Sequence, residues 1–166
     1  MKEFESLAEF ATHLVELQAA EALALHKGLD RVAALIQGTA KGEIGHYQEA
    51  SGPFPEWADL AESTEAEKAR LGYPSDAPLL RTGGLRDSIE RETEGFEAII
   101  GSTDPVMEYQ EFGTPNIPPR PVIGPAAFNN QHKIEEIVVA AAVSGLVGTD
   151  VIHPSLGYDL DVIAKK

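Results

Sequence analysis

Apolar side chains recur at steps of three and four residues over residues 4–39, a spacing that places them on one face of an α-helix. They are Phe4, Leu7, Phe10, Leu14 and Leu17, followed by Leu25, Leu29, Val32 and Ile36. Ser6 and Glu9 have the spacing of a capping box at the start of this helix. Gly28 is a predicted kink or break, because glycine costs about 1 kcal/mol relative to alanine inside a helix. We therefore expect a long N-terminal helix whose apolar face packs in a core or against a neighbouring subunit.

The helical periodicity fails from Gly42 to about Pro78. Prolines and glycines interrupt this stretch at Gly45, Gly52, Pro53, Pro55, Gly72 and Pro74. Two short helical turns are predicted within it, at residues 56–60 and 64–71. A loop-rich insertion of this length in a compact domain is usually functional or ordered by a partner.

The apolar period changes from 3.6 to two over residues 87–112, which is typical of strands. On the first predicted strand, one face carries Ile89, Arg91 and Thr93, and the other carries Glu90, Glu92 and Glu94. A turn at Glu94-Gly95 leads to a second strand, residues 96–100, and a third is predicted from Val106 to Phe112. Three consecutive short strands predict an antiparallel meander.

A proline-dense loop follows at residues 115–121 and is too rich in proline for a central strand. Pro125 suits the first turn of a helix that should run to about Val143, and the tail alternates as a short final strand. The predicted fold class is therefore α+β, with a small antiparallel sheet of three to four strands packed with the N-terminal and C-terminal helices. Residues 1–147 form a single predicted domain, with the loop-rich insertion at 42–78, and residues 148–166 form a C-terminal arm.

The charge balance limits the partners that this chain can bind. The 166 residues include 13 Lys and Arg against 27 Asp and Glu, a formal net charge of −14. Wrapping of nucleic acid needs clustered cations, so the balance argues against it, whereas an acidic surface suits DNA that slides past without adhering. Solubility alone explains the acidity equally well. The absence of cysteine excludes disulfides, a thiol nucleophile and Cys-ligated metals, and no apolar run predicts a membrane span or a secretion signal.

No motif in the sequence requires catalysis. The five histidines lack metal-ligand spacing, Thr82-Gly83-Gly84 lacks the rest of a phosphate-binding loop, and no nucleophile elbow occurs. Crowded carboxylates favour the protonated form of one of them, so Glu90, Glu92 and Glu94 are the best candidate for a general acid. The same three residues suit a solvated outer face, or the lining of a channel in a ring. We predict no catalytic residue, cofactor or metal site.

Three segments in order resemble blocks of the neck and tail-completion proteins of tailed bacteriophages, the virion-morphogenesis and head–tail joining type. Residues 78–89 resemble their "LL-x-TG-x-L-x-x-SI" segment, residues 99–114 their "GS…EFGT" block, and residues 117–126 their "PPRPF-x-x-PA" helix entry, with Val122 in place of Phe. Upstream, Trp57, Leu60, Ser63, Thr64 and Lys68 resemble the "W-x-x-L…ST…K" stretch of the virion-morphogenesis subgroup. The matching positions are candidate family-motif and interface residues: Leu80, Thr82, Gly83, Leu85, Ser88, Ile89, Tyr109, Glu111, Phe112, Gly113, Thr114, Pro119, Arg120 and Pro121.

The resemblance implies a structural virion protein rather than an enzyme. Such a subunit forms a homo-oligomeric ring, a hexamer in preference to a dodecamer, that joins or completes head and tail and lets DNA pass. Its other partners would be adaptor or stopper proteins of the neck and a tail terminator or tail tube, in the host cytoplasm during assembly and then in the virion. The arm 148–166 is expected to reach an adjacent subunit. The alternatives are a small carboxylate-dependent hydrolase and an assembly chaperone absent from the particle.

Overall fold

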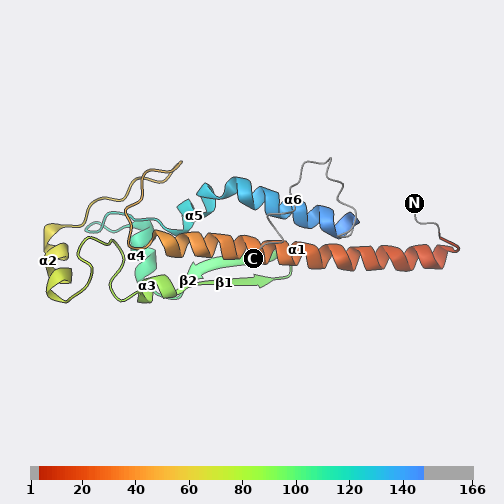
Figure 1. Ribbon diagram of the computed structural model, residues 1–166, viewed down its shortest axis with the longest axis horizontal. Coiled ribbons are helices and arrows are strands. Elements are labelled where there is room, and N and C mark those ends of the chain that lie inside the picture. The colour runs from red at the N-terminus through yellow and green to blue at the C-terminus, as the bar shows by residue number, and fades with distance from the viewer. Residues whose placement is uncertain (1–3, 148–166) are drawn as a thin grey trace. The chain divides into compact units, whose positions relative to one another are not determined.

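The computed structural model describes residues 4–147, and these divide into two compact units. Unit 1 takes in residues 4–32, 93–97 and 133–147, and unit 2 takes in residues 33–92 and 98–132. The elements along the chain are α1 (Leu7–Glu43), α2 (Glu62–Arg70), α3 (Gly84–Asp87), β1 (Ile89–Glu94), β2 (Glu97–Ser102), α4 (Val106–Phe112), α5 (Ile123–Asn129) and α6 (Gln131–Val147) (Figure 1). The α+β class is confirmed, and the described residues hold two strands, where three to four were expected of the chain.

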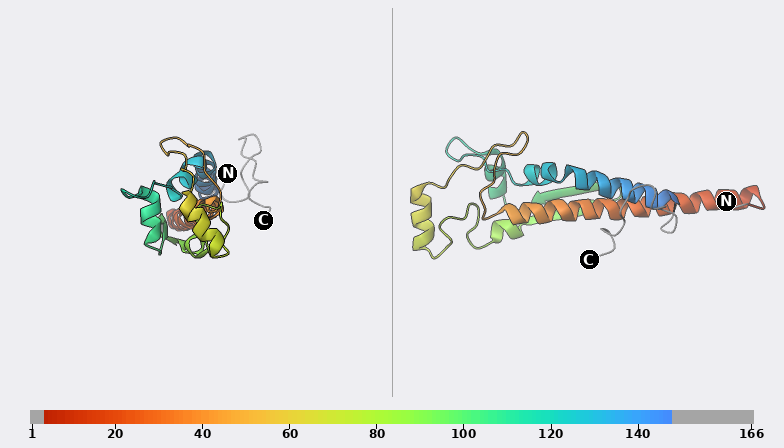
Figure 2. Two further views of the ribbon diagram at one scale, coloured as in Figure 1. Left: turned by 90° about the vertical axis from the view of Figure 1, so that its left-hand side faces the viewer. Right: turned by 45° about the horizontal axis from the view of Figure 1, so that its top comes forward.

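The N-terminal helix forms as predicted, but without a break at Gly28. The hydroxyl oxygen of Ser6 accepts the backbone N–H of Glu9 at 3.1 Å and so caps α1. Gly28 is buried where α6 passes, and a Cβ atom placed on it would lie 2.5 Å from the Cβ of Ala141. The glycine therefore serves close packing of α1 on α6 within unit 1, where the two helices lie side by side (Figure 1 and Figure 2).

The two strands form the hairpin that the sequence predicts. It turns at Gly95, whose φ of 55° lies in the left-handed region that glycine adopts readily. Ile89 is fully buried at the start of β1, and its carbonyl oxygen accepts the Gln37 side-chain N–H at 2.8 Å. The Gln37 amide oxygen in turn accepts the Arg91 guanidinium N–H at 2.8 Å, so one side chain of α1 fixes β1 in unit 2.

The prediction of a third strand at residues 106–112 is wrong, because these residues form the helix α4. The carboxylate of Asp104 accepts the backbone N–H of Val106 at 2.9 Å, and Pro105 stands at the helix entry. The helix buries Met107, and the chain leaves it at Gly113, which has a φ of 73°. The predicted final strand of the tail lies outside the described residues.

The predicted helix from Pro125 to about Val143 is two helices, α5 and α6, separated at Asn130. The buried Asn130 amide donates to the Ala126 carbonyl oxygen at 2.8 Å and to the Thr39 hydroxyl at 3.0 Å, which holds the junction in unit 2. Of the two predicted helical turns, that at 64–71 is the helix α2, whereas residues 56–60 are not helical. Within residues 4–147, no helix combines the length and the apolarity that crossing a bilayer requires.

Candidate functional site

The motif residues of unit 2 meet around the entry to α5. The backbone N–H groups of Val122, Ile123 and Gly124 donate to the Glu111 carboxylate at N···O distances of 2.7, 3.3 and 3.1 Å. These groups have no partner inside the helix, and a negative charge there also complements the helix dipole. Met107 anchors α4 in the core, and Glu111 follows it by four residues on the same helical face, which directs the carboxylate inward.

Arg120 links the same loop to the segment after Trp57. Its backbone N–H donates to the Gln110 carbonyl oxygen at 2.6 Å, and its guanidinium Nη2 donates to the Ala58 and Asp59 carbonyl oxygens at 2.8 and 3.2 Å. The side chain is buried, and burial lowers the pKa of the guanidinium. Buried arginines need such acceptors, since an unpaired charge in the interior is costly.

The indole of Trp57 ties the loop a second time. The ring is 4% exposed, and its Nε1–H donates to the Pro121 carbonyl oxygen at 3.0 Å. Residues 57–59 are therefore held to the proline-rich loop by side-chain hydrogen bonds in both directions, one from Trp57 and the others from Arg120. The loop itself is closed by paired backbone hydrogen bonds between Thr114 and Ile117, of 2.9 and 3.1 Å.

Gly113 is required where α4 leads into this loop. Its φ of 73° is unfavourable for other residues, and an added Cβ would lie 3.0 Å from the Ile117 carbonyl oxygen and from Pro119. Pro119 is exposed on its outer side, whereas Pro121 is buried. The glycine and the proline of the motif thus form a close backbone contact.

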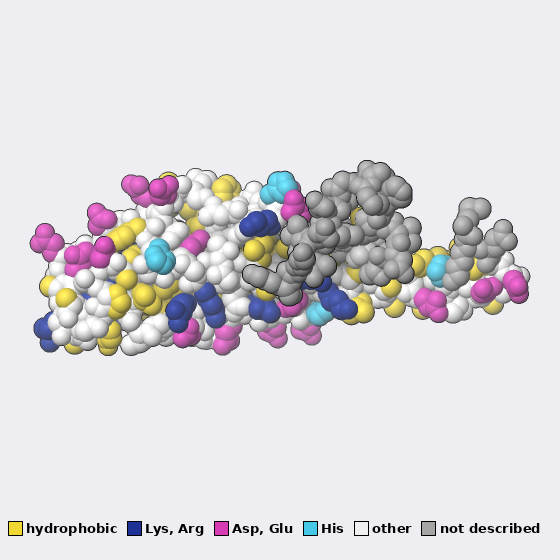
Figure 3. Space-filling view, viewed as in Figure 1, with side chains coloured by type: hydrophobic (Ala, Val, Ile, Leu, Met, Phe, Trp, Pro, Cys, Tyr) yellow, Lys and Arg dark blue, Asp and Glu magenta, His cyan; other side chains and the backbone are white. Residues whose placement is uncertain are grey.

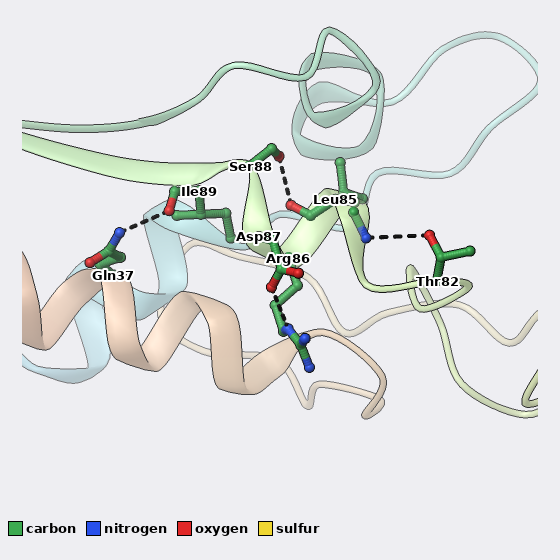
Figure 4. Close-up of polar contacts among 8 residues, drawn as sticks. Gln37, Thr82, Leu85, Arg86, Asp87, Ser88 and Ile89 are labelled. Atoms are coloured by element: carbon green, nitrogen blue, oxygen red, sulfur yellow. Dashed lines mark hydrogen bonds and ion pairs between the residues drawn. The ribbon is translucent and has the colours of Figure 1, made fainter.

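The segment 79–89 is held by local hydrogen bonds. Gly83, buried with a φ of 92°, precedes α3, and the Ser88 hydroxyl donates to the Leu85 carbonyl oxygen at 2.7 Å and contacts the Ser102 hydroxyl at 2.8 Å. Figure 4 shows the hydrogen bond from Ser88 to Leu85, together with Gln37 on the carbonyl of Ile89 and the Thr82 hydroxyl facing the backbone N–H of Gly84. The motif therefore builds a turn, one helical turn and the start of β1.

A groove of about 800 Å³ opens in unit 2 beside this segment. Its lining includes the loop 79–85, Lys68, Asp104, Gln110, Ile117 and Arg120. Leu80, Thr82, Gly83 and Leu85, all predicted as motif residues, lie in it. Leu79 adopts a φ of 63°, a left-handed conformation that costs roughly 1–2 kcal/mol for a residue with a Cβ. We call this feature the unit-2 groove.

Two aromatic residues of the motif point outward. Tyr109 is 52% exposed and Phe112 is 78% exposed on α4, the helix that directs Glu111 inward. Exposed large apolar side chains also lie on the first part of α1, at Leu7, Phe10, Leu14 and Val15 (Figure 3). The inward residues of the motif thus build unit 2, and its aromatic residues remain available at the surface.

Glu90, Glu92 and Glu94 are all exposed on β1. Their side chains lie on the face opposite Ile89, as the alternation predicts. This arrangement agrees with a solvated face and with a channel lining alike. The structure does not bring these carboxylates to the groove, and among the described residues no group of three or more His, Asp or Glu side chains is arranged to hold a metal ion.

One buried acid was not singled out by the sequence analysis. Glu43, 7% exposed at the end of α1, has a carboxylate oxygen, Oε2, that finds no hydrogen-bond partner within residues 4–147. Burial raises the pKa of the Glu43 carboxyl to about 7, and repulsion from the Glu111 carboxylate adds to this rise. A signal for this residue exists, because Glu43 follows Ile36 by two helical turns on the buried stripe of α1.

Comparisons of the chain with family models, with curated proteins and with solved structures found no significant match.

Proposed function

We propose that this chain is a structural subunit of the neck or tail of a tailed bacteriophage, forming a ring that joins or completes head and tail and lets DNA pass. The proposal rests on one observation about the segments that resemble this family: some of their residues stabilise unit 2, and others are exposed apolar side chains. Glu111, Gly113 and Arg120 hold the frame of unit 2, while Tyr109 and Phe112 present apolar surface. Large exposed aromatic side chains are enriched in protein–protein contacts.

A ring also needs two unlike contact faces on each subunit, since head-to-tail contacts close by rotation. The apolar residues of α4 in unit 2 supply one candidate face, and those at the start of α1 in unit 1 supply another. The exposed Glu90, Glu92 and Glu94 would line the channel, where their charge repels DNA within the screening length of about 8 Å at physiological salt. The other partners are the neighbouring neck proteins and the tail terminator or tail tube.

The test is the mass of the purified full-length chain over a range of concentrations, measured by mass photometry and followed by electron microscopy of the particles. We expect a ring of six chains. Phe112→Asp should dissociate it, and the matched variant Leu71→Asp, which changes an exposed leucine outside the motif, should leave it intact. A chain that stays monomeric at high concentration would overturn the proposal. Detection of the chain in purified particles would separate a virion protein from an assembly chaperone.

A further inference from the structure

Two residues that line the unit-2 groove, Arg120 and Gln110, each have a buried polar atom that is left unpaired among residues 4–147. Arg120 is 6% exposed, and its Nη2 donates to two carbonyl oxygens, but its Nε–H has no partner among the described residues. The side-chain oxygen of Gln110 is also buried, and no partner for it lies in the described part of the chain. Both residues line the groove and are joined through the backbone hydrogen bond from Arg120 to Gln110. Buried polar atoms left unpaired cost roughly 1–3 kcal/mol each.

A peptide segment carries the kinds of partner that both atoms lack. Each peptide unit offers one carbonyl oxygen and one N–H, which match an arginine Nε–H and a glutamine oxygen. The groove also has an apolar wall, formed by Leu79, Leu80, Leu85, Val106 and Ile117. Backbone groups that pair and apolar side chains that fill a wall are the elements of extended-peptide recognition.

The charges of the groove favour an acidic segment. Three cations line it, Lys68, Arg81 and Arg120, against the two acids Asp59 and Asp104. Arg81 also lies 3.8 Å from the carboxylate of Glu67, in an exposed ion pair. Lys68 is 3% exposed, and burial lowers the pKa of its ammonium group, with the Arg81 guanidinium lowering it further. A carboxylate placed between Lys68 and Arg81 would favour the charged form of both side chains.

We propose that the unit-2 groove binds residues 156–163 of a second copy of this chain in an extended conformation. This segment, LGYDLDVI, alternates apolar and acidic residues, so an extended chain places Tyr158, Leu160 and Val162 on one face and Asp159 and Asp161 on the other. The apolar face suits the leucine-rich wall, and the acidic face suits the cations. The inference rests on the proposed function, in which copies of the chain are neighbours.

The segment can reach an adjacent copy. Residues 148–166 follow α6, and a chain of this length spans up to about 65 Å when fully extended. If such arms are exchanged around a ring, each subunit donates one segment and has its own groove filled by another. This is a head-to-tail contact, the kind that closes a ring by rotation.

Site-specific photo-crosslinking tests the proposal on the full-length protein. The photoreactive residue p-benzoylphenylalanine replaces Thr82 or Val106, which are exposed lining residues of the groove. Chains carrying natural isotopes and chains labelled with ¹⁵N are mixed, irradiated and digested. We expect crosslinks to residues 156–163, including pairs that join a light chain to a heavy one. The same probe at Leu71, an exposed leucine outside the groove lining, should give no such product.

Charge-reversal variants test whether the acidic residues of the segment contribute to binding. Asp159→Lys should reduce the crosslinked product at least fivefold and Asp159→Lys with Asp161→Lys at least tenfold, whereas Asp150→Lys, which matches the single charge change but lies outside the segment, should leave it within twofold. Crosslinks that map elsewhere, or that join only chains of the same isotope, would overturn the proposal. Particle mass, measured on the same samples, separates the two claims. Intact rings without the crosslink overturn this inference alone, and monomers overturn the proposed function.

Discussion

The carboxylates of Glu43 and Glu111 in unit 2 repel each other, and among the described residues it is Glu111 that accepts hydrogen bonds that stabilise its charge. Glu111 accepts three backbone N–H groups at the start of α5. Glu43 has an unpartnered oxygen, and its pKa is raised to about 7, first by burial and then by Glu111. Glu43 is therefore the group that takes up a proton near neutral pH.

This difference predicts a loss of stability as the pH rises. Below pH 4.5, the ordinary pKa of glutamate, Glu43 is protonated in both the folded and the unfolded chain. Between that value and about 7 the unfolded chain releases the proton while the folded chain keeps it, so the free energy of unfolding falls with rising pH. The full effect, of the order of 3 kcal/mol, is reached above pH 7.

Glu43→Gln should remove this dependence. We expect the variant to exceed the wild type at pH 8 by up to about 3 kcal/mol and to match it within about 1 kcal/mol near pH 4.5, as measured by urea unfolding. The control is Glu49→Gln, which changes an exposed glutamate and should shift stability by less than about 0.5 kcal/mol at either pH. Equal stability of E43Q and wild type at pH 8 would contradict the assignment.

Glu111 is expected to act in two ways that its variants separate. Glu111→Ala removes the acceptor of three backbone N–H groups and should destabilise the chain by about 1–2 kcal/mol. Glu111→Gln keeps an acceptor oxygen but removes the charge, so it should cost less and also reduce the fall in stability between pH 5 and 8, since less repulsion acts on Glu43. An E111Q variant with the pH dependence of the wild type would show that the two carboxylates are not coupled.

The long helix, the hairpin and the α+β class follow from local patterns, whereas α4 shows where such patterns mislead. Residues 106–112 alternate well enough to predict a strand. Asp104-Pro105 before them and Gly113 after them are the start and stop signals of a helix, and burial of Met107 with Glu111 one turn later decides for it. Capping and tertiary burial outweighed alternation over a short segment.

Some features of the candidate site could likewise be predicted from local sequence, and others could not. Glycines such as Gly113 and the proline-rich loop are visible in the sequence as motif positions, because local geometry requires them. The pairing of Glu43 with Glu111, and the unpaired atoms of Gln110 and Arg120 in the groove, depend on segments far apart in the chain. A single sequence carries no signal for which distant side chains meet, beyond a charged residue on a buried stripe.

Trp57 is expected to stabilise unit 2 through its hydrogen bond to Pro121 as well as through burial. Trp57→Phe keeps an aromatic ring but leaves the Pro121 carbonyl oxygen unpaired, which should lower the free energy of unfolding by about 1–3 kcal/mol. Because the chain has one tryptophan, this variant is followed by circular dichroism rather than fluorescence. The exposed aromatic substitution Phe96→Leu is the control, with an expected change below about 0.5 kcal/mol. A loss no larger than that of the control would rule out a structural role for the indole N–H.

Because Gly28 lies against Ala141, we expect Gly28→Ala to lower the stability, although the substitution of glycine by alanine in a helix usually raises it. Alanine in place of an exposed helical glycine stabilises by about 0.5–1 kcal/mol. At Gly28 the added methyl would lie 2.5 Å from the Ala141 Cβ, so α1 and α6 must separate and Gly28→Ala should destabilise unit 1 by about 1–3 kcal/mol. Ala141→Gly in the same chain removes the opposing methyl and should recover most of that loss in thermal unfolding.

Gly38 gives the matched comparison on the same helix, since nothing lies within 4 Å of a Cβ placed there. Gly38→Ala should therefore stabilise the chain by about 0.5–1 kcal/mol, opposite in sign to Gly28→Ala, and it should be additive with Ala141→Gly because the two positions share no contact. If Gly28→Ala and Gly38→Ala both stabilised the chain, α1 and α6 would not pack as closely as the contact between residues 28 and 141 requires. Gly28 would then mark a tolerated weakness of the helix rather than a packing requirement.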